Sequence, residues 1–216
     1  MPDATQPVGE TAPEPGAPSR LASESPWYFE HRNRLIILLA AATVAASWWG
    51  VPLGRWSLVA GGACVAFSVL LRFWCIRQIG GAAHRRVHAK ANVLVRWGPF
   101  GFARNPIYVA NMGLFAALTV FAGLPWLVPV VLALLLLQYT FTINYEEKFL
   151  REKFGAEFDD YCRTTPRWLP VPRWVRSPLD FQPYPFAKLL RKERGFLIQI
   201  AACVAFGAAR WWWLSR

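Results

Sequence analysis

The chain has 216 residues, of which 55% are hydrophobic and 17% are charged, and 12 of them are tryptophan. This composition excludes an ordinary soluble domain, and the long uncharged runs between clusters of charge indicate an all-α, polytopic membrane protein. The formal net charge of +11 could suit nucleic acid, but the basic residues stand beside apolar runs. That arrangement favours membrane orientation and anionic headgroups, so we expect a lipid bilayer as partner and no nucleic acid.

Residues 1–26 are rich in proline, alanine, glycine and small polar side chains, and we predict a disordered tail there. Two membrane helices are expected in the next part of the chain, residues 27–92, at about 35–49 and 56–74. Arg72 lies near the end of the second helix. A charge at the bilayer centre costs roughly 2.5–3.5 kcal/mol, so we expect this side chain to extend to the interface.

The connection from Arg77 to Arg104 is strongly basic and contains no acidic residue. By the positive-inside rule this loop faces the cytoplasm, as does the N-terminus. We expect a multi-pass integral membrane protein, located in a bacterial inner membrane. His84 and His88 are spaced as a helical metal pair, but no third ligand accompanies them. The four cysteines show no metal-ligand spacing, so we expect neither a metal site nor a disulfide.

The stretch from Trp97 to Tyr108, W-G-P-F-G-F-A-R-N-P-I-Y, is the centre of the predicted site. Gly98 and Pro99 mark a turn, so no regular structure is expected in the first half of this stretch. In the second half, Asn105 is a favourable N-cap and Pro106 suits the first position of a helix. A loop that leads into a helix is therefore predicted.

An almost wholly apolar run, residues 107–122, follows and is about long enough to cross a bilayer. Its start would place unpaired N–H groups and the positive end of the helix dipole at the water boundary, beside Arg104. We predict an anion-binding corner at this point. The simpler alternative is a helix start without a ligand.

The third and fourth spans, about 106–122 and 126–144, are predicted to form a tight hairpin around a short turn. The fourth span continues into the cytosol as a helix that ends near Gly155, with Glu147 and Arg151 as an i,i+4 ion pair. A short further helix is expected after it.

Because the hairpin is antiparallel and its spans are of similar length, its two cytosolic ends emerge at the same face of the membrane. The helix start at Arg104 therefore comes within reach of two adjacent carboxylates, Glu146 and Glu147. A polar stripe of the fourth span points toward the same corner: Gln138, Thr142 and Tyr145. Cations and carboxylates together suit a zwitterionic ligand with hydroxyl groups, whereas the carboxylates alone could simply form a solvated helix face.

The C-terminal part, residues 171–216, is basic and interrupted by proline before it becomes apolar. Residues 186–194 could lie on the membrane surface with their lysines and arginines toward the headgroups. A last span is predicted at about 196–213, which makes about five membrane helices in all. The hairpin and its cytosolic helices, residues 93–170, form the core of the predicted site.

Several pieces of this core resemble the integral membrane methyltransferases, namely the isoprenylcysteine carboxyl methyltransferases and the phospholipid N-methyltransferases. The signature of these families is R-H-P-x-Y, a hydrophobic segment and then E-E. The matching pieces occur in this order: Gly98-Pro99, Arg104 to Tyr108, Glu146-Glu147, Phe154-Gly155, Tyr161 and Arg167-Trp168-Leu169-Pro170.

This resemblance implies a methyltransferase that uses S-adenosylmethionine, held at the cytosolic face, and a lipid or lipidated acceptor that enters from the bilayer. It implies donor-binding roles for Gly98, Pro99, Arg104, Asn105, Tyr108, Gln138, Tyr145, Glu146 and Glu147. It implies catalytic roles for Arg104 and Tyr108, and Arg163 or Arg167 would be the group that holds an anionic acceptor.

The chain departs from the family pattern at Asn105, where the family most often has histidine, and at Phe158, where it commonly has tyrosine. Asparagine can form hydrogen bonds but cannot titrate near neutral pH as histidine does. An ammonium acceptor must lose a proton before it can react, whereas a carboxylate or thiolate needs no base. Asn105 therefore favours a carboxylate or thiolate acceptor over an amine.

Two other functions remain open at this point. A related membrane architecture serves reductases that use NADPH, and the basic stretch 85–96 could hold the 2′-phosphate of that cofactor. A membrane partner protein without catalytic activity is the second alternative. The sequence leaves the identity of the acceptor and the oligomeric state open.

Overall fold

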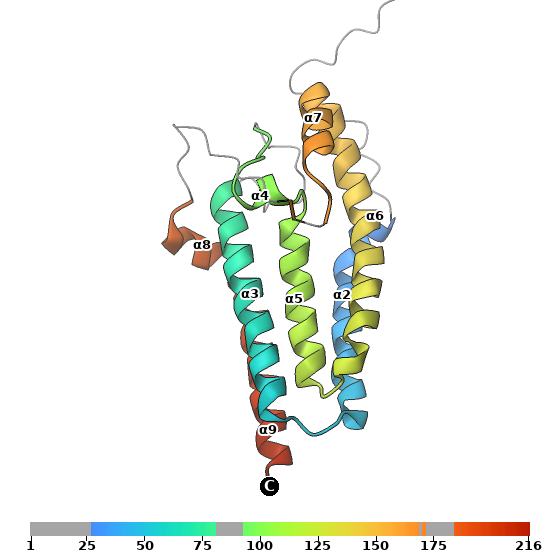
Figure 1. Ribbon diagram of the computed structural model, residues 1–216, viewed down its shortest axis with the longest axis vertical. Helices are drawn as coiled ribbons and strands as arrows, with labels where there is room; N and C mark the ends of the chain where they lie inside the picture. The colour runs from blue at the N-terminus through green and yellow to red at the C-terminus, as the bar shows by residue number, and fades with distance from the viewer. Residues whose placement is uncertain (1–26, 81–92, 169, 172–183) are drawn as a thin grey trace, which may run out of the picture.

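The computed structural model describes residues 27–80, 93–168, 170–171 and 184–216. In these ranges it contains eight α-helices and no strand, which confirms the all-α class. Figure 1 shows the long helices running alongside one another: α2 (Trp27–Ala46), α3 (Arg55–Ile79), α5 (Pro106–Phe121), α6 (Val128–Phe154) and α9 (Arg194–Leu214). They form the body of the molecule.

Three short helices lie toward one end of this bundle. They are α4 (Pro99–Phe102), α7 (Ala156–Thr164) and α8 (Phe186–Lys192). Helix α4 lies between the ends of α3 and α5, whereas α7 follows α6 and α8 packs beside α3 (Figure 1). We call this the α4 end of the bundle; the C-terminus of the chain lies at the opposite end.

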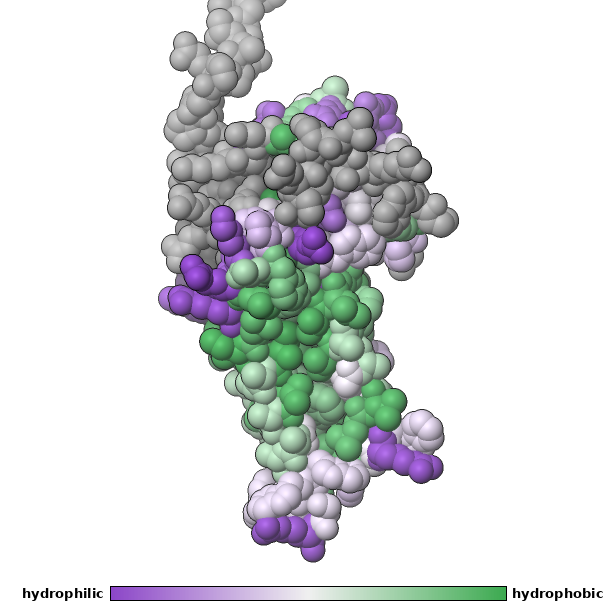
Figure 2. Space-filling model, turned by 90° about the vertical axis from the view of Figure 1, so that its left-hand side faces the viewer, coloured by the Kyte–Doolittle hydropathy of each residue, from purple (hydrophilic) through white to green (hydrophobic). Residues whose placement is uncertain are grey.

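The bundle has the surface of a membrane protein. Three helices are long and apolar enough to cross a bilayer, namely α3, α9 and the helix Pro125–Phe154 that contains α6. Figure 2 shows a broad apolar area across the middle of the face in view, with hydrophilic residues toward both ends. A large apolar surface of this kind marks contact with lipid. The membrane bundle is thus confirmed, whereas spans formed by α2 and by the 16-residue helix α5 stay predictions.

Helix α6 continues without a break past residue 144, the predicted end of the fourth span, as the sequence predicts. It ends at Phe154, and Gly155 then adopts a positive φ of 49°, which glycine accommodates at helix ends without steric cost. The predicted pair of Glu147 and Arg151 is wrong. Arg151 instead bonds Asp159 of α7 at 2.8 Å, because Glu147 is turned into the protein toward two other arginines.

Some sequence-based boundaries need correction. The first helix begins at Trp27, well before the predicted start at residue 35, and it ends at Ala46. The last residues of the predicted span, Ser47–Trp49, form a separate 3-10 turn. The tail 1–26, residues 81–92 with His84 and His88, and residues 172–183 lie outside the described residues.

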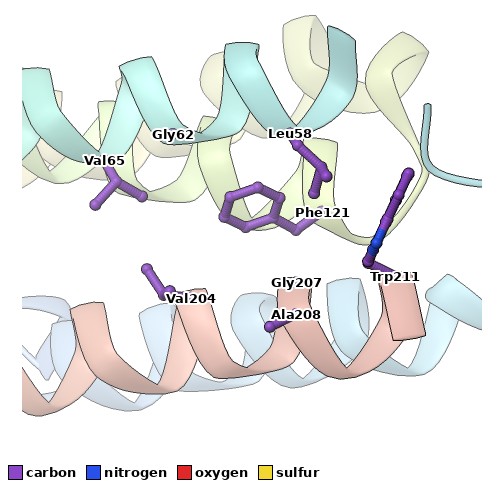
Figure 3. Close-up of a pocket in the computed structure, with 8 residues that line it drawn as sticks. All are labelled: Leu58, Gly62, Val65, Phe121, Val204, Gly207, Ala208 and Trp211. Atoms are coloured by element: carbon purple, nitrogen blue, oxygen red, sulfur yellow. The ribbon is translucent and has the colours of Figure 1, made fainter. Parts of the chain in front are cut away.

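Helices α3, α5 and α9 pack closely around the ring of Phe121. A Cβ atom on Gly61 of α3 would lie 2.3 Å from Cε1 of this ring, and one on Gly207 of α9 would lie 2.8 Å from its Cγ. Small residues that admit a large neighbour are typical of helix contacts in membranes. Beside this contact the three helices leave an apolar groove of about 390 Å³, into which the Phe121 ring projects (Figure 3).

The neighbouring glycines of α3 give a direct test of this packing. Gly61→Ala should destabilise the protein by about 1–3 kcal/mol, because the added methyl group collides with Phe121. Gly62→Ala should leave stability unchanged or raise it, because nothing lies within 4 Å of its Cβ position and alanine favours helix. Thermal unfolding in detergent compares the two; equal midpoints for both variants would contradict the packing described.

The position of Arg72 corrects a second expectation. Its side chain is largely buried and bonds Glu193 Oε2 through Nε at 2.7 Å and Asn111 Oδ1 through Nη1 at 2.7 Å. The guanidinium also lies over the ring of Phe196, 4.4 Å from its centroid. Arg72 therefore stays inside the bundle instead of extending to the interface, because a carboxylate from the start of α9 compensates its charge.

Candidate active site

The loop before α5 is shaped by glycine and proline. Gly98 has a φ of 59° and packs against Gln78, whose Cγ would lie 3.1 Å from an added Cβ. Contrary to expectation, the next residues are regular: Pro99 opens the one-turn helix α4, since its fixed φ suits a first helical position. Arg104 N–H then donates to the carbonyl of Pro166 at 2.9 Å, which fixes the chain just before α5.

Asn105 occupies the N-cap position of α5 and Pro106 its first residue, as predicted. The Asn105 side chain nevertheless forms no cap bond. Its Nδ2 donates to the carbonyl of Arg167 at 3.3 Å instead, because the segment after α7 passes beside the start of α5. Asn105 thus joins the two chain segments that border the site.

Glu147 is the centre of the candidate site. Its residue is only 8% exposed, and its carboxylate accepts from Arg104 Nη2 at 3.1 Å and from Arg167 Nη2 at 2.6 Å. The Nε atoms of both arginines also donate to Glu147 Oε1. The helix start at Arg104 and the carboxylates of α6 therefore do meet, and Arg167 joins them from the segment after α7.

Arg104 also binds the C-terminal end of α7. Its Nη1 donates to the carbonyls of Cys162 at 3.1 Å and Thr165 at 2.5 Å. Helix ends leave such carbonyls without intrahelical partners, and a cation is favourable there. These two acceptors were not predicted from the sequence. Pro166 was the available signal, because the residue before a proline is disfavoured in helix and Thr165 is extended.

Glu146 points to a second partner on α5. It accepts a hydrogen bond from the Tyr108 hydroxyl at 2.8 Å. The Tyr108 ring packs on the ring of Tyr139, with 4.6 Å between the centroids. The two adjacent glutamates thus contact two different residues of the R-N-P-I-Y motif: Glu147 bonds Arg104 before α5, and Glu146 bonds Tyr108 on α5.

Other predicted site residues lie elsewhere. Gln138 donates to the carbonyl of Arg32 at 2.8 Å and therefore faces α2. Tyr145 is half-buried on α6. Arg163 is mostly exposed and bonds Asp160 of its own helix. The structure brings together Arg104, Asn105, Tyr108, Glu146, Glu147 and Arg167, with Gly98 and Pro99 on the adjoining loop.

Two side chains beside the site are held in their protonated forms. Burial raises the pKa of the Tyr161 phenol, whose hydroxyl donates to the carbonyl of Phe100 at 2.7 Å. Burial also raises the pKa of the Cys162 thiol, against the opposing effect of Arg104. Neither group is therefore an ionised nucleophile at neutral pH.

Comparison with known proteins matches a segment that contains most of this site. Residues 56–157, from α3 to the start of α7, match the family described as phospholipid methyltransferase. This part of the chain is similar to the phospholipid methyltransferase family.

Two relatives of the chain are named for metal resistance. The nickel-cobalt-cadmium resistance protein NccN of Alcaligenes xylosoxydans xylosoxydans is 29% identical over 142 residues, which are 66% of this chain and 63% of that protein. The cobalt-zinc-cadmium resistance protein CzcN of Cupriavidus metallidurans is 31% identical over 142 residues, which are 63% of this chain and 61% of that protein. The matched part thus spans less than two thirds of either relative. No solved structure matches the chain significantly.

The family match and the site overlap only in part. The segment contains Arg104, Tyr108, Glu146 and Glu147, but it ends before Arg167. The second arginine on Glu147 thus comes from outside the matched segment. The described residues contain no group of three or more histidine, cysteine or acidic side chains that could hold a metal ion.

Proposed function

We propose that the chain transfers a methyl group from S-adenosylmethionine to an acceptor held in the membrane. The observation that carries this proposal is the meeting of Glu147 with Arg104 and Arg167, next to Glu146 and Tyr108, at a segment similar to the phospholipid methyltransferase family. We place the α4 end at the cytosolic face, because the basic connection leaves the bundle there.

The chemistry of this set fits the methyl donor. Carboxylates of Glu146 and Glu147 can accept hydrogen bonds from ribose hydroxyls and from the donor's ammonium group, and Arg104 together with the start of α5 can hold its carboxylate. The loop at Gly98 and Pro99 would border the same space. When bound, S-adenosylmethionine supplies a methyl group on a positively charged sulfur that leaves as a neutral thioether.

The protein contributes to the reaction by holding the methyl donor in position relative to the acceptor. Glu147 already pairs with Arg104 and Arg167, so a ligand with both charges can exchange with these partners without leaving an uncompensated charge. Holding two reactants in line can supply about 7–11 kcal/mol of the reduction in barrier. Arg163 is not part of this proposal, because it points away on the exposed side of α7.

Titration of the purified protein with both candidate cofactors tests the assignment. We expect S-adenosylmethionine to bind and to quench tryptophan fluorescence, since Trp97 and Trp168 lie on the segments that border the site. NADPH should produce no saturable change at the same concentrations. Binding of NADPH alone would favour the reductase, and binding of neither would favour a protein without catalytic activity.

The names of NccN and CzcN connect these relatives with metal resistance. We propose that a part played by this chain in resistance depends on methyl transfer to a membrane component. A strain that lacks the gene should then regain cobalt and cadmium tolerance with the wild-type gene but not with Glu147→Gln. If Glu147→Gln is present in the membrane at the wild-type level and restores tolerance equally well, resistance does not depend on methyl transfer, and this proposal is wrong.

A further inference from the structure

Helix α8 is amphipathic, although it is only seven residues long. Its apolar side chains Phe186, Leu189 and Leu190 share one side of the helix, and Leu189 is fully buried. The Phe186 ring packs edge-on against Phe73 of α3, with 6.3 Å between the centroids, yet 57% of this residue is exposed. An amphipathic helix that exposes apolar side chains beside a membrane bundle lies at the bilayer interface.

The opposite side of α8 is basic. Lys188, Arg191 and Lys192 occupy positions i, i+3 and i+4, so their side chains are neighbours. These three cations line an open pocket of about 290 Å³, and its fourth lining residue is Tyr184. Figure 2 views the molecule from the side on which Figure 1 shows α8, and hydrophilic residues border the apolar area there. The pocket therefore lies at the level of the lipid headgroups.

Two of the lining residues are fixed by the end of α3. Lys192 Nζ donates to the carbonyl of Gly80 at 3.0 Å and lies over the Tyr184 ring, 5.3 Å from its centroid. The Tyr184 N–H in turn donates to the carbonyl of Arg77 at 3.0 Å. One wall of the pocket is thus held in place before a ligand arrives, which lowers the entropic cost of binding.

The cations of the pocket have no counter-ion in the part of the chain that the structure describes. None of Lys188, Arg191 and Lys192 forms an ion pair there. The adjacent acid, Glu193, is 1% exposed, bonds Arg72 at 2.7 Å and does not line the pocket. Partial burial lowers the pKa of the Lys192 ammonium, against the attraction of Glu193. An anion in the pocket would favour the charged form of this lysine.

We propose that this pocket binds the phosphate of an anionic phospholipid in the leaflet at the α4 end of the bundle. Lys188 and Arg191 are exposed on the pocket side of α8 and donate to the phosphate oxygens. Lys192 adds positive potential from the fixed wall. The acyl chains of the lipid lie in the bilayer beside Phe186 and Leu190, which are both exposed.

A pocket of this kind is more specific than the general attraction of a basic surface to headgroups, which the sequence predicts for residues 186–194. Arg194 belongs to the same basic run and is exposed, but it does not line the pocket. A bound lipid would hold α8 against α3, and with it the start of α9, where Glu193 meets Arg72. The site does not depend on methyl transfer, and the lipid that it holds is a structural ligand and not the methyl acceptor.

Arg191→Gln and its matched control Arg194→Gln test the site. Native mass spectrometry of the protein in a non-ionic detergent measures its affinity for phosphatidylglycerol and for zwitterionic phosphatidylcholine, which should bind much more weakly. We expect Arg191→Gln to weaken phosphatidylglycerol binding on the order of 10-fold, because a hydrogen bond to a charged group is lost. Arg194→Gln should weaken it by no more than about twofold, since a charge outside the pocket is screened.

Thermal unfolding supplies a second readout. Without anionic lipid, both variants should unfold at the wild-type midpoint, because neither arginine forms an ion pair in the described residues. Phosphatidylglycerol should raise the midpoint of the wild type and of Arg194→Gln, and that of Arg191→Gln much less. A ligand that binds only the folded state stabilises it more as its affinity rises.

Equal losses of affinity in Arg191→Gln and Arg194→Gln would show general surface attraction only and would overturn the proposal, as would binding that neither variant changes. Inorganic phosphate is the remaining probe. If it binds as tightly as phosphatidylglycerol and depends on Arg191 in the same way, the pocket serves a soluble phosphate and the lipid assignment is wrong. The lipid measurements need no S-adenosylmethionine, so the failure of either proposal leaves the other standing.

Discussion

Glu147→Gln is expected to lower the thermal midpoint of the purified protein and to remove S-adenosylmethionine binding at the concentrations that saturate the wild type. The substitution keeps the shape of the side chain but leaves Arg104 without its ionic partner in a largely buried position. Loss of one partner from a buried ion pair costs about 3–5 kcal/mol. Arg167 is more exposed, so water compensates part of its loss.

Glu152→Gln is the matched control, because Glu152 lies on the same helix and is exposed. It should change neither the midpoint nor donor affinity beyond error. Isothermal titration with S-adenosylmethionine and differential scanning fluorimetry measure the two quantities. If Glu147→Gln folds and binds the donor as tightly as the wild type does, Glu147 is not a donor-binding residue.

Glu193→Met is expected to destabilise the protein by a similar amount, about 3–5 kcal/mol, because it leaves the Arg72 charge inside the bundle without a counter-ion. Glu193 is 1% exposed, so water cannot take its place. The pair joins α3 to the beginning of α9, and its loss should loosen the C-terminal helix first. Thermal unfolding together with protease sensitivity near Gly195 measures both effects.

The double variant Arg72→Met with Glu193→Met separates charge from packing. Replacement of a whole buried ion pair by apolar side chains is often neutral or stabilising, so the double variant should recover most of the stability that Glu193→Met loses. Arg151→Met is the control for an exposed pair and should cost at most about 1 kcal/mol. A double variant as unstable as the single one would show that the geometry, and not the compensated charge, stabilises this contact.

The sequence alone predicts those features of the site that depend on helix capping and on the length of a turn. Asn105 and Pro106 mark the start of α5, and the short turn around Gly123 predicts that α5 and α6 are antiparallel neighbours. From these two facts the approach of Arg104 to Glu147 follows without any contact information. The helical extension of α6 up to Gly155 is likewise a matter of local pattern.

Contacts that depend on helix rotation could not be predicted in the same way. The sequence predicts that Gln138 faces the corner, but the rotation of α6 about its axis directs this side chain to α2. Arg72 and Glu193 are 121 residues apart, and no spacing rule connects them. Glu147 pairs with Arg104 and not with Arg151, because its side chain is buried inside the protein. The i,i+4 rule for ion pairs along a helix does not take burial into account.

The most direct test of the account is transfer of a labelled methyl group from S-adenosylmethionine into the lipid-soluble fraction by purified protein in nanodiscs made from native membrane lipids. We expect label in that fraction with the wild type and with Glu152→Gln, and none with Glu147→Gln. Label that stays in the aqueous donor with folded wild-type protein, or equal transfer by Glu147→Gln, would contradict it.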